Sequence, residues 1–203
     1  MMQLKKYISG KSVAVIGNSN NLMSYSYGRE IDEHDIVIRM NRGILIPDTH
    51  CFGARTDIWC YSTYKLVKEI YPLCKCDIRV YMSPKERKLF KKGPENLFFP
   101  MTLWKSLNMQ LSARPSVGAM VSYLLLQCEP RTVTFYGFDF KATKSFYEKK
   151  NNTGSHNFLK EKQLIQDISL KNNWIMKECS KEYKGNTKFN NYLLKVKNIL
   201  RIT

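Results

Sequence analysis

The sequence predicts an α/β domain with a Rossmann-like, mostly parallel sheet flanked by helices. Short apolar segments that are typical of buried strands alternate along the chain with longer segments that are typical of helices. The chain has 203 residues, of which 43% are hydrophobic and 12% aromatic, and this is enough for one substantial core. We therefore expect a single domain over residues 1–203.

The predicted strands and helices alternate from residue 12 onward. Apolar segments predict strands at 12–17, 35–40, 55–62, 76–83 and 131–140, the last of which reaches a turn at Gly137. Helices are predicted at 63–71, 84–92, 101–109, 116–128 and 157–171. The polar residues from about 141 to 156 predict a mobile surface loop. Ligands of such sheets bind at the carboxyl ends of the strands.

The last segment, 166–203, is strongly basic. Leu193, Val196 and Leu200 fall on one face of a helix among many lysines, a pattern that fits a helix lying on a membrane surface. The same pattern fits a terminal helix that packs on the core and leaves its lysines in solvent, and we prefer this second interpretation.

Charge and hydropathy limit the cellular setting. The formal net charge of +16 would attract nucleic acid, anionic lipid or a phosphorylated saccharide. No apolar run has the length of a signal peptide or a membrane span, so we expect a cytoplasmic protein, soluble or peripheral on the inner face of the membrane. A nucleic-acid-binding protein is an alternative suggested by the charge and the twelve tyrosines, although no RNP-like, zinc or helix-turn-helix pattern is present.

The six cysteines indicate neither a zinc site nor a disulfide framework. Their only close spacing is between Cys74 and Cys76, and no CxxC pair occurs. We expect free, buried thiols.

The stretch VAVIGNSNNL, residues 13–22, predicts a ligand-binding turn after the first strand. A dinucleotide site needs glycines at the first, third and sixth positions of such a turn, and only Gly17 is present. A Walker A loop is also absent. The amide and hydroxyl side chains of this turn suit a base, a ribose or a single phosphate better than a pyrophosphate.

Three ordered motifs resemble those of the sialyltransferase family. VAVIGNSNNLMSYSYGREIDEHDIVIRMNRG (13–43) resembles the long sialyl motif, PSVGAMVSYLLLQCEPRTVTFYGFDF (115–140) the short motif, and HNFLKE (156–161) the His-x4-Glu motif. The resemblance covers residues 12–165. It implies a GT-A-like fold variant and an inverting transferase that takes a 2-keto sugar acid from a CMP-activated donor.

The resemblance assigns residues to the CMP site. It implies that Asn18 and Asn41 contact the nucleotide and that Ser19 lies near the phosphate. It further implies that Ser116 and Gly118 present N–H groups at a helix start to the phosphate, and that Gly137 of the Tyr-Gly-Phe sequence belongs to the same site.

The resemblance also assigns the general base. It makes His156 the group that accepts the proton of the acceptor hydroxyl, and an imidazole suits this role because its ordinary pKa is about 6.5. Glu161 either orients this imidazole or forms a cap and an ion pair with Lys160 or Lys162, and we prefer the orienting role. His34 is expected to be architectural and His50 a surface residue.

Two departures from the family pattern are visible. Ser145 stands where the third motif usually has a histidine, so assistance to the departing phosphate is expected to be absent or to come from Lys144 or Lys149. Val13 stands where the animal enzymes have the disulfide partner of Cys128, which agrees with a reducing compartment. No Asp-x-Asp triplet occurs, since Asp32 and Asp35 are one residue too far apart, and no metal or other cofactor is implied.

Small size and the missing disulfide lead us to expect a bacterial enzyme. The acceptor would be a glycan or glycolipid, such as lipooligosaccharide, lipopolysaccharide or capsule, with peripheral contact to an anionic membrane. The donor sugar is sialic acid or Kdo, since both leave from CMP. A catalytically inactive protein that binds a CMP-sugar or a glycan is the alternative within the family, and nucleic acid is not expected as a partner.

Overall fold

The protein is described by a computed structural model that covers residues 1–85, 87, 96–151 and 153–184. Seven parallel strands form one sheet in the order β5-β4-β3-β2-β1-β6-β7. The strands are β1 (Ser12–Ile16), β2 (Ile36–Met40), β3 (Ile58–Tyr61), β4 (Ile78–Tyr81), β5 (Asn96–Phe98), β6 (Thr132–Tyr136) and β7 (Ile175–Met176). The order reverses at β1, which pairs with β2 on one side and β6 on the other.

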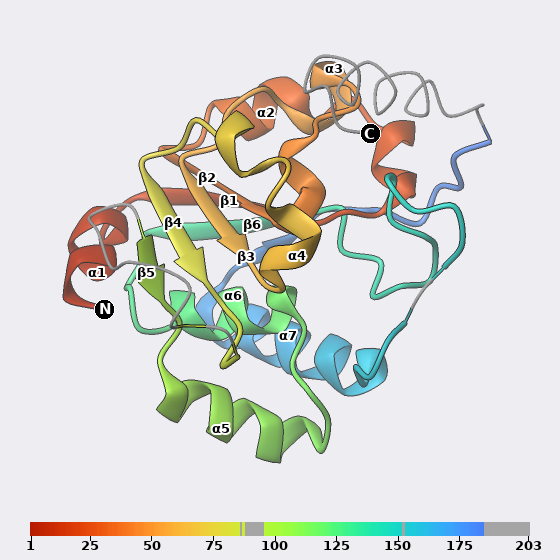
Figure 1. The fold of residues 1–203 in the computed structure, drawn as a ribbon. Helices are drawn as coiled ribbons and strands as arrows, with labels where there is room; N and C mark the ends of the chain where they lie inside the picture. Colours follow the sequence, from red (N-terminus) through yellow and green to blue (C-terminus); the bar gives the residue numbers. More distant parts are fainter. Residues whose placement is uncertain (86, 88–95, 152, 185–203) are drawn as a thin grey trace.

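Helices cover both faces of this sheet (Figure 1). The α-helices are α1 (Met2–Ile8), α2 (Gly28–Asp32), α3 (Thr49–Phe52), α4 (Tyr64–Val67), α5 (Met101–Leu111), α6 (Val117–Leu125) and α7 (Phe158–Asn172). The 3-10 helices are η1 (Asn20–Ser24), η2 (Asn41–Ile44) and η3 (Tyr71–Leu73). Figure 1 shows α5, α6 and α7 grouped on one side and α2 and α3 on the other.

The core has two parts, one on each face of the sheet. Along β1, Val13 and Val15 pack with residues of α5, α6 and α7, whereas Ala14 and Ile16 pack with η1, α2 and α3. This alternation follows from side chains that point to opposite faces of a strand. Because both faces are covered, β1 and β2 are apolar except for Ser12 at the start of β1 and the buried Arg39 in β2.

Most of the predicted elements are confirmed. The five predicted strands correspond to β1, β2, β3, β4 and β6, and the helices at 101–109, 116–128 and 157–171 to α5, α6 and α7. The helix predicted at 63–71 is wrong in its length: α4 ends at Val67, and the separate η3, with Pro72 in its first turn, begins at Tyr71. The helix predicted at 84–92 and the one at the end of the chain lie mainly outside the described residues.

The loop after β6 is not the mobile surface loop that its polarity predicts. Ser145 and Phe146 are buried, and the Phe146 ring lies edge-on to Phe52 with centroids 5.0 Å apart. The Phe146 N–H donates to the carbonyl of Asn18 at 2.9 Å. Two aromatic residues within the polar run supply enough apolar contact to fix the loop against the turn after β1.

The turns after β1 and β6 approach each other closely at the carboxyl edge of the sheet. A Cβ atom on Gly17 would lie 2.2 Å from the carbonyl oxygen of Gly137, whose own φ is +68°. No side chain fits at position 17 without moving the backbone. The two glycines therefore let the residues that follow β1 and those that follow β6 lie around one space.

The chain after β7 returns across the first motif. Asn21 donates to the carbonyl of Cys179 at 3.4 Å, and the Lys181 N–H donates to the Tyr25 hydroxyl at 2.9 Å. α7 spans the boundary at residue 165, so the sialyltransferase-like region and the basic segment share a helix.

All six cysteines are free and five are buried, as expected, with Cys76 half-buried. In the part of the chain that is described, no helix combines the length and apolarity needed to span a membrane.

Candidate active site

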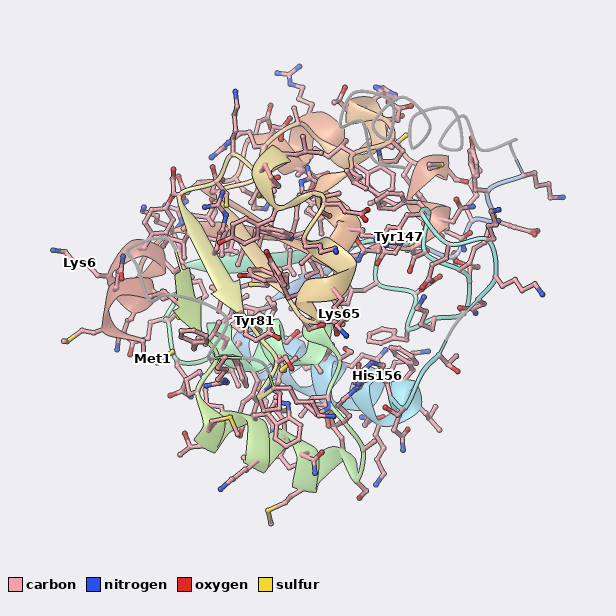
Figure 2. All side chains as sticks on the ribbon, viewed as in Figure 1. Met1, Lys6, Lys65, Tyr81, Tyr147 and His156 are labelled. Carbon is pink, nitrogen blue, oxygen red and sulfur yellow. The ribbon has the colours of Figure 1, made fainter. Side chains whose placement is uncertain are left out.

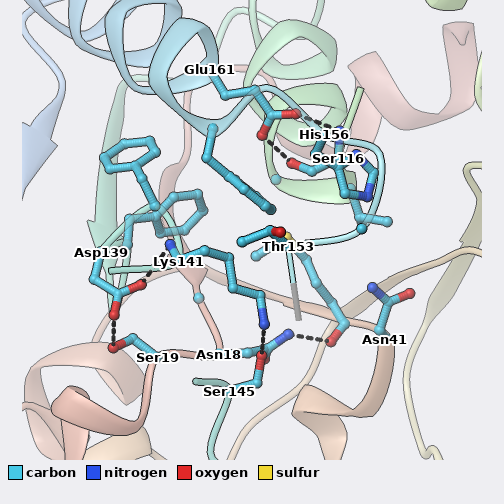
Figure 3. Close-up of a pocket in the computed structure, with 18 of the residues that line it drawn as sticks. Asn18, Ser19, Asn41, Ser116, Asp139, Lys141, Ser145, Thr153, His156 and Glu161 are labelled. Carbon is cyan, nitrogen blue, oxygen red and sulfur yellow. Dashed lines mark hydrogen bonds between the residues drawn. The ribbon is translucent and has the colours of Figure 1, made fainter. Parts of the chain in front are cut away.

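A cavity of about 340 Å³ lies at the carboxyl ends of β1, β2, β3 and β6, where parallel sheets bind their ligands. All eight residues predicted for the site line it: Asn18, Ser19, Asn41, Ser116, Gly118, Gly137, His156 and Glu161. Figure 3 shows His156, Ser116 and Glu161 at one end of the cavity and Asn18 and Ser145 at the other. The structure thus brings the three motifs together, while the individual roles remain predictions.

Asn18 is held in place but keeps one free acceptor. Its Nδ2 group donates to the Met40 carbonyl at 3.2 Å and to the Tyr147 hydroxyl at 3.1 Å. Its Oδ1 atom is buried without a hydrogen-bond partner among the described residues, and a Cβ on Gly43 would lie 2.4 Å from it. A buried acceptor without a donor is costly, so a ligand that donates a hydrogen bond would stabilise this site.

Asn41 follows β2 in a left-handed conformation with φ of 50°, which asparagine tolerates better than most residues. Its Oδ1 atom accepts from the Ser62 N–H at 3.0 Å, and its carbonyl accepts from Trp59 Nε1 at 2.8 Å. Asn41 is therefore fixed by the end of β3. Within the described residues, its Nδ2 group forms no hydrogen bond and remains a donor for a ligand.

Ser19 supports the turn rather than offering its proton to a ligand. Its hydroxyl donates to Asp139 at 2.8 Å and accepts from the Asn21 N–H at 3.1 Å, which caps η1. The side chain is 4% exposed. The predicted contact of Ser19 with a phosphate is not favoured by this geometry, because the hydroxyl proton is already used.

Lys141 is the cation beside Ser145, whereas the sequence led us to expect either no substitute for the histidine or Lys144 or Lys149. Its Nζ atom donates to Ser145 Oγ at 2.9 Å and to Glu148 at 2.5 Å, as Figure 3 shows for Ser145. Lys141 lines the cavity, whereas Lys144 and Lys149 do not. Positive φ angles at residues 140 and 141, 54° and 63°, turn the chain back so that this lysine faces inward.

Tyr147 is a further cavity residue that the sequence analysis did not single out. Burial raises the pKa of its hydroxyl to about 12, so the hydroxyl keeps its proton at neutral pH. Figure 2 shows Tyr147 and His156 in the region beyond the strand ends, and both line the cavity. The sequence feature that could have indicated this residue is the Phe-Tyr pair after Ser145, because the Phe146 ring anchors the loop and the Tyr147 side chain reaches the cavity.

His156 has a defined tautomer. Its Nδ1–H donates to the carbonyl of Arg114 at 2.7 Å, and because a carbonyl only accepts, the proton lies on Nδ1. Nε2 therefore carries the lone pair, and Arg114 Nη2 lies 3.4 Å from it. Burial lowers the pKa of His156, as do the charges of Arg114 and Lys141, while the bond to the carbonyl opposes this. The imidazole is thus neutral at pH 7, as a general base must be.

Glu161 does not orient His156, and this preferred prediction is wrong. Its carboxylate accepts from the Ser116 N–H at 2.7 Å and from the Ser116 hydroxyl at 2.5 Å. α7 begins at Phe158 and is capped by Asn157, so His156 precedes the helix and is not one turn away. Glu161 also forms no ion pair with either neighbouring lysine among the described residues. Burial raises its pKa, and the two bonds from Ser116 partly offset this.

The start of α6 is organised by this carboxylate. Ser116 is the N-cap, since its hydroxyl accepts from the Ala119 N–H at 3.2 Å. Its own N–H is taken by Glu161, so the N–H groups that remain for a ligand are those of Val117 and Gly118. A Cβ on Gly118 would lie 3.2 Å from the Phe138 ring, which leaves little room for a side chain there.

No group of three or more His, Cys, Asp or Glu side chains that suits a metal ion exists within the described ranges.

Comparison with known proteins agrees with this fold and these motifs. Residues 5–89 match the model of the family described as glycosyltransferase family 29 (sialyltransferase). CMP-N-acetylneuraminate-beta-galactosamide-alpha-2,3-sialyltransferase 1 from Mus musculus is 44% identical over 52 residues, 26% of this chain and 15% of the mouse protein. The Homo sapiens protein of the same name is 41% identical over 63 residues, 31% and 17% of the two chains. The matched segment thus spans about a sixth of these curated relatives.

Solved structures extend the likeness over nearly the whole fold. A mammalian sialyltransferase superposes with a TM-score of 0.58 at 19% identity, covering 91% of this chain and 78% of the other. The sialyltransferase CstII from Campylobacter jejuni, in complex with cytidine-5'-monophosphate, superposes with a TM-score of 0.61 at 13% identity, covering 91% and 84%. These structures establish a shared fold. The chain is thus similar to glycosyltransferase family 29, the sialyltransferase family, in residues 5–89 and in its ordered motifs.

Proposed function

We propose that this protein transfers a sialic acid, with inversion, from its CMP-activated form to a hydroxyl of a glycan acceptor. The observation that carries the proposal is the unprotonated Nε2 atom of His156, which lies in the same cavity as the amide groups of Asn18 and Asn41. A base and a nucleotide site in one cavity are what such a transfer needs.

The nucleotide is proposed to lie at the end of the cavity formed by the turns after β1 and β2. The unpartnered Oδ1 atom of Asn18 and the Nδ2 group of Asn41 offer one acceptor and one donor there. Amide side chains of this kind recognise the hydrogen-bonding edge of a base or a ribose. Fixed partners on Met40, Tyr147 and Ser62 hold both amides before the ligand arrives, which lowers the entropic cost of binding.

The leaving phosphate is proposed to meet Lys141 and the hydroxyl of Tyr147. As the bond between the anomeric carbon and the phosphate oxygen breaks, CMP gains negative charge. A lysine cation and a protonated tyrosine in a partly enclosed cavity stabilise that charge, and the N–H groups of Val117 and Gly118 add to it if the phosphate reaches α6. The Lys141 cation and these neutral donors together support transfer without a metal, which EDTA treatment tests.

The attack is proposed to come from the His156 side. The acceptor hydroxyl gives its proton to Nε2 of His156 while its oxygen forms the new bond to the anomeric carbon, on the face opposite the departing CMP. Nδ1 keeps its proton and its bond to the Arg114 carbonyl. This bond fixes the ring and favours the imidazolium that forms.

The choice of sialic acid rests on the names of the relatives, which use CMP-N-acetylneuraminate. CMP-Kdo is the second donor to be tested. For the acceptor, we propose a bacterial surface glycolipid or capsule assembled at the inner face of the membrane. The support for this setting is the net charge of +16, which suits phosphorylated glycans and anionic lipid.

The first test is calorimetric titration with CMP and UMP in EDTA, followed by assays of CMP release and sugar transfer from CMP-sialic acid and CMP-Kdo. Selective CMP binding, with transfer that His156→Ala abolishes and the exposed control His50→Ala retains, supports the proposal. CMP binding without release or transfer from either donor indicates the inactive CMP-sugar-binding protein. Absence of CMP selectivity contradicts the nucleotide site itself.

A further inference from the structure

Arg114 is a cation of the cavity whose charge no described residue neutralises. It belongs to the loop between α5 and α6 and lines the cavity beside His156. Its guanidinium forms no ion pair in the described part of the chain. The one hydrogen bond of this side chain among the described residues joins Nη2 to Nε2 of His156 at 3.4 Å, which is long for a hydrogen bond between nitrogen atoms and therefore weak.

The acidic residues of the cavity are all occupied elsewhere. Glu148 pairs with Lys141 at 2.5 Å, and Glu161 is bound to Ser116 at 2.7 and 2.5 Å. Asp139 accepts from Ser19 at 2.8 Å and from the Thr143 N–H at 3.0 Å. None of these three carboxylates forms an ion pair with Arg114 among the described residues, so its guanidinium keeps its donors for an anion that a ligand brings.

The position of Arg114 favours an anionic group on the acceptor, rather than one on the donor, as the partner of its guanidinium. Arg114 is exposed, and Gly154 lies beside it, since Nη2 is 4.0 Å from the place of a Cβ on that glycine. Asn18, which is proposed to bind the nucleotide, lies at the opposite end of the cavity (Figure 3). A substrate that arrives from solvent next to the base is therefore the first to meet this cation.

We propose that Arg114 binds an anionic group, a carboxylate or a phosphate, that the acceptor carries next to the attacked hydroxyl. The inference rests on the proposed transfer to a glycan. The ion pair would also draw Nη2 away from Nε2 of His156, because a bidentate bond to an anion is stronger than one long bond to a neutral nitrogen. Acceptor binding would then free the lone pair that removes the hydroxyl proton.

The test compares three acceptors with the same neutral core: a lactoside, the same lactoside carrying a sialic acid, and the same lactoside carrying a phosphate monoester. Initial rates with saturating CMP-sialic acid give KM and kcat for the wild type, Arg114→Leu, Arg114→Lys and the control Arg29→Leu. Arg29 is a matched arginine on α2, with a side chain 92% exposed. Donor KM and acceptor-free CMP release are measured for each protein.

The wild type and Arg29→Leu are expected to prefer one anionic acceptor by about tenfold or more in kcat/KM. The preferred acceptor identifies the anion as carboxylate or phosphate. Arg114→Leu should lose this preference through a higher acceptor KM, with little change in donor KM, and Arg114→Lys should keep part of it.

Three results would overturn the inference. A wild type without preference for either anionic acceptor contradicts it directly, as does Arg114→Leu that loses the same factor with all three acceptors. A raised donor KM and slower acceptor-free CMP release in Arg114→Leu would assign the guanidinium to the carboxylate of the donor sugar instead. In each of these cases CMP is still released, so the proposed function stands. Absence of CMP release from every donor overturns both.

Discussion

The carboxylate of Glu161 holds both polar groups of Ser116, accepting from its N–H at 2.7 Å and from its hydroxyl at 2.5 Å. This contact joins the first turn of α7 to the N-terminus of α6, and the carboxylate also suits the positive end of the α6 dipole. Arg114 lies two residues before Ser116, and His156 lies five residues before Glu161. The pair therefore fixes the two segments that meet at the proposed base.

Replacing Glu161 by alanine should destabilise the fold. The Ser116 N–H and hydroxyl would lose their partner, and water does not easily replace it because Glu161 is only 2% exposed. Unsatisfied buried groups cost about 1–3 kcal/mol each. We expect a loss of roughly 2–4 kcal/mol in the free energy of unfolding, measured by urea denaturation. The exposed Glu69→Ala should change it by less than about 0.5 kcal/mol. Equal stability of the two variants would contradict the anchoring role.

The same residue makes a prediction about pH. Because the pKa of Glu161 is raised by burial, its contribution to stability is fully present below the ordinary pKa of about 4.5 and is lost as the pH rises through the folded value. Glu161→Gln removes this titration but keeps the shape. The stability difference between the Glu161→Gln variant and the wild type should therefore shift in favour of the variant as the pH rises from about 4 to about 7. A constant difference over this range would argue against a raised pKa.

His156 should produce the acid limb of the pH–rate profile. Its pKa lies below the ordinary 6.5, so the neutral imidazole predominates at pH 7, and kcat/KM should fall only as the pH decreases below about 6.5. In Arg114→Leu the loss of a neighbouring positive charge should move this limb to higher pH. A limb above pH 7 in the wild type, or no movement in the variant, would contradict the assignment of the base.

Lys141 should affect the departure of CMP more than the binding of the acceptor. Lys141→Met should lower kcat about 10²-fold, the loss typical of one removed transition-state donor, and Lys141→Arg should retain part of the rate because it keeps the charge. Lys149→Met provides the matched control, since Lys149 is an exposed lysine of the same loop that does not line the cavity. A similar loss in both methionine variants would show that only the net charge of the loop matters.

The fold was largely predictable from sequence, because its determinants are local. The strands β1, β2 and β6 are short apolar segments, and each is followed by motif residues; in a parallel sheet those residues must meet at one edge. β5 and β7 have three and two residues, too short for an apolar pattern to be visible. α1 buries only Leu4 and Ile8. Lys5 and Lys6 lie between them, so the helical spacing of two apolar residues was not recognisable in the sequence.

The chemical environment of the site was less predictable, because it depends on tertiary contacts. Glu161 was assigned to His156 because the two are neighbours in one motif, yet its partner Ser116 lies 45 residues away. Lys141 faces inward because of positive φ angles at residues that are neither glycine nor asparagine, which the sequence does not signal. Arg114 reaches the base only because the α5–α6 loop lies beside the start of α7.

Gly43 provides a test of the nucleotide end of the cavity. A methyl group at this position would lie 2.4 Å from Oδ1 of Asn18, so in Gly43→Ala the amide must turn away from Met40 and Tyr147. We expect the Kd for CMP to rise about tenfold, while the overpacking should cost about 1–3 kcal/mol of stability. Calorimetric titration measures the first effect and urea denaturation the second.

A double-mutant cycle decides whether this loss acts through Asn18. Asn18→Ala should weaken CMP binding by a similar factor, because it removes the amide that Gly43→Ala displaces. If both changes act on the same amide, the double variant should bind CMP about as weakly as either single variant, so the two effects are not additive. Additive losses would mean that the methyl group at position 43 obstructs the nucleotide itself, and Asn18 would then contribute to CMP binding independently of Gly43.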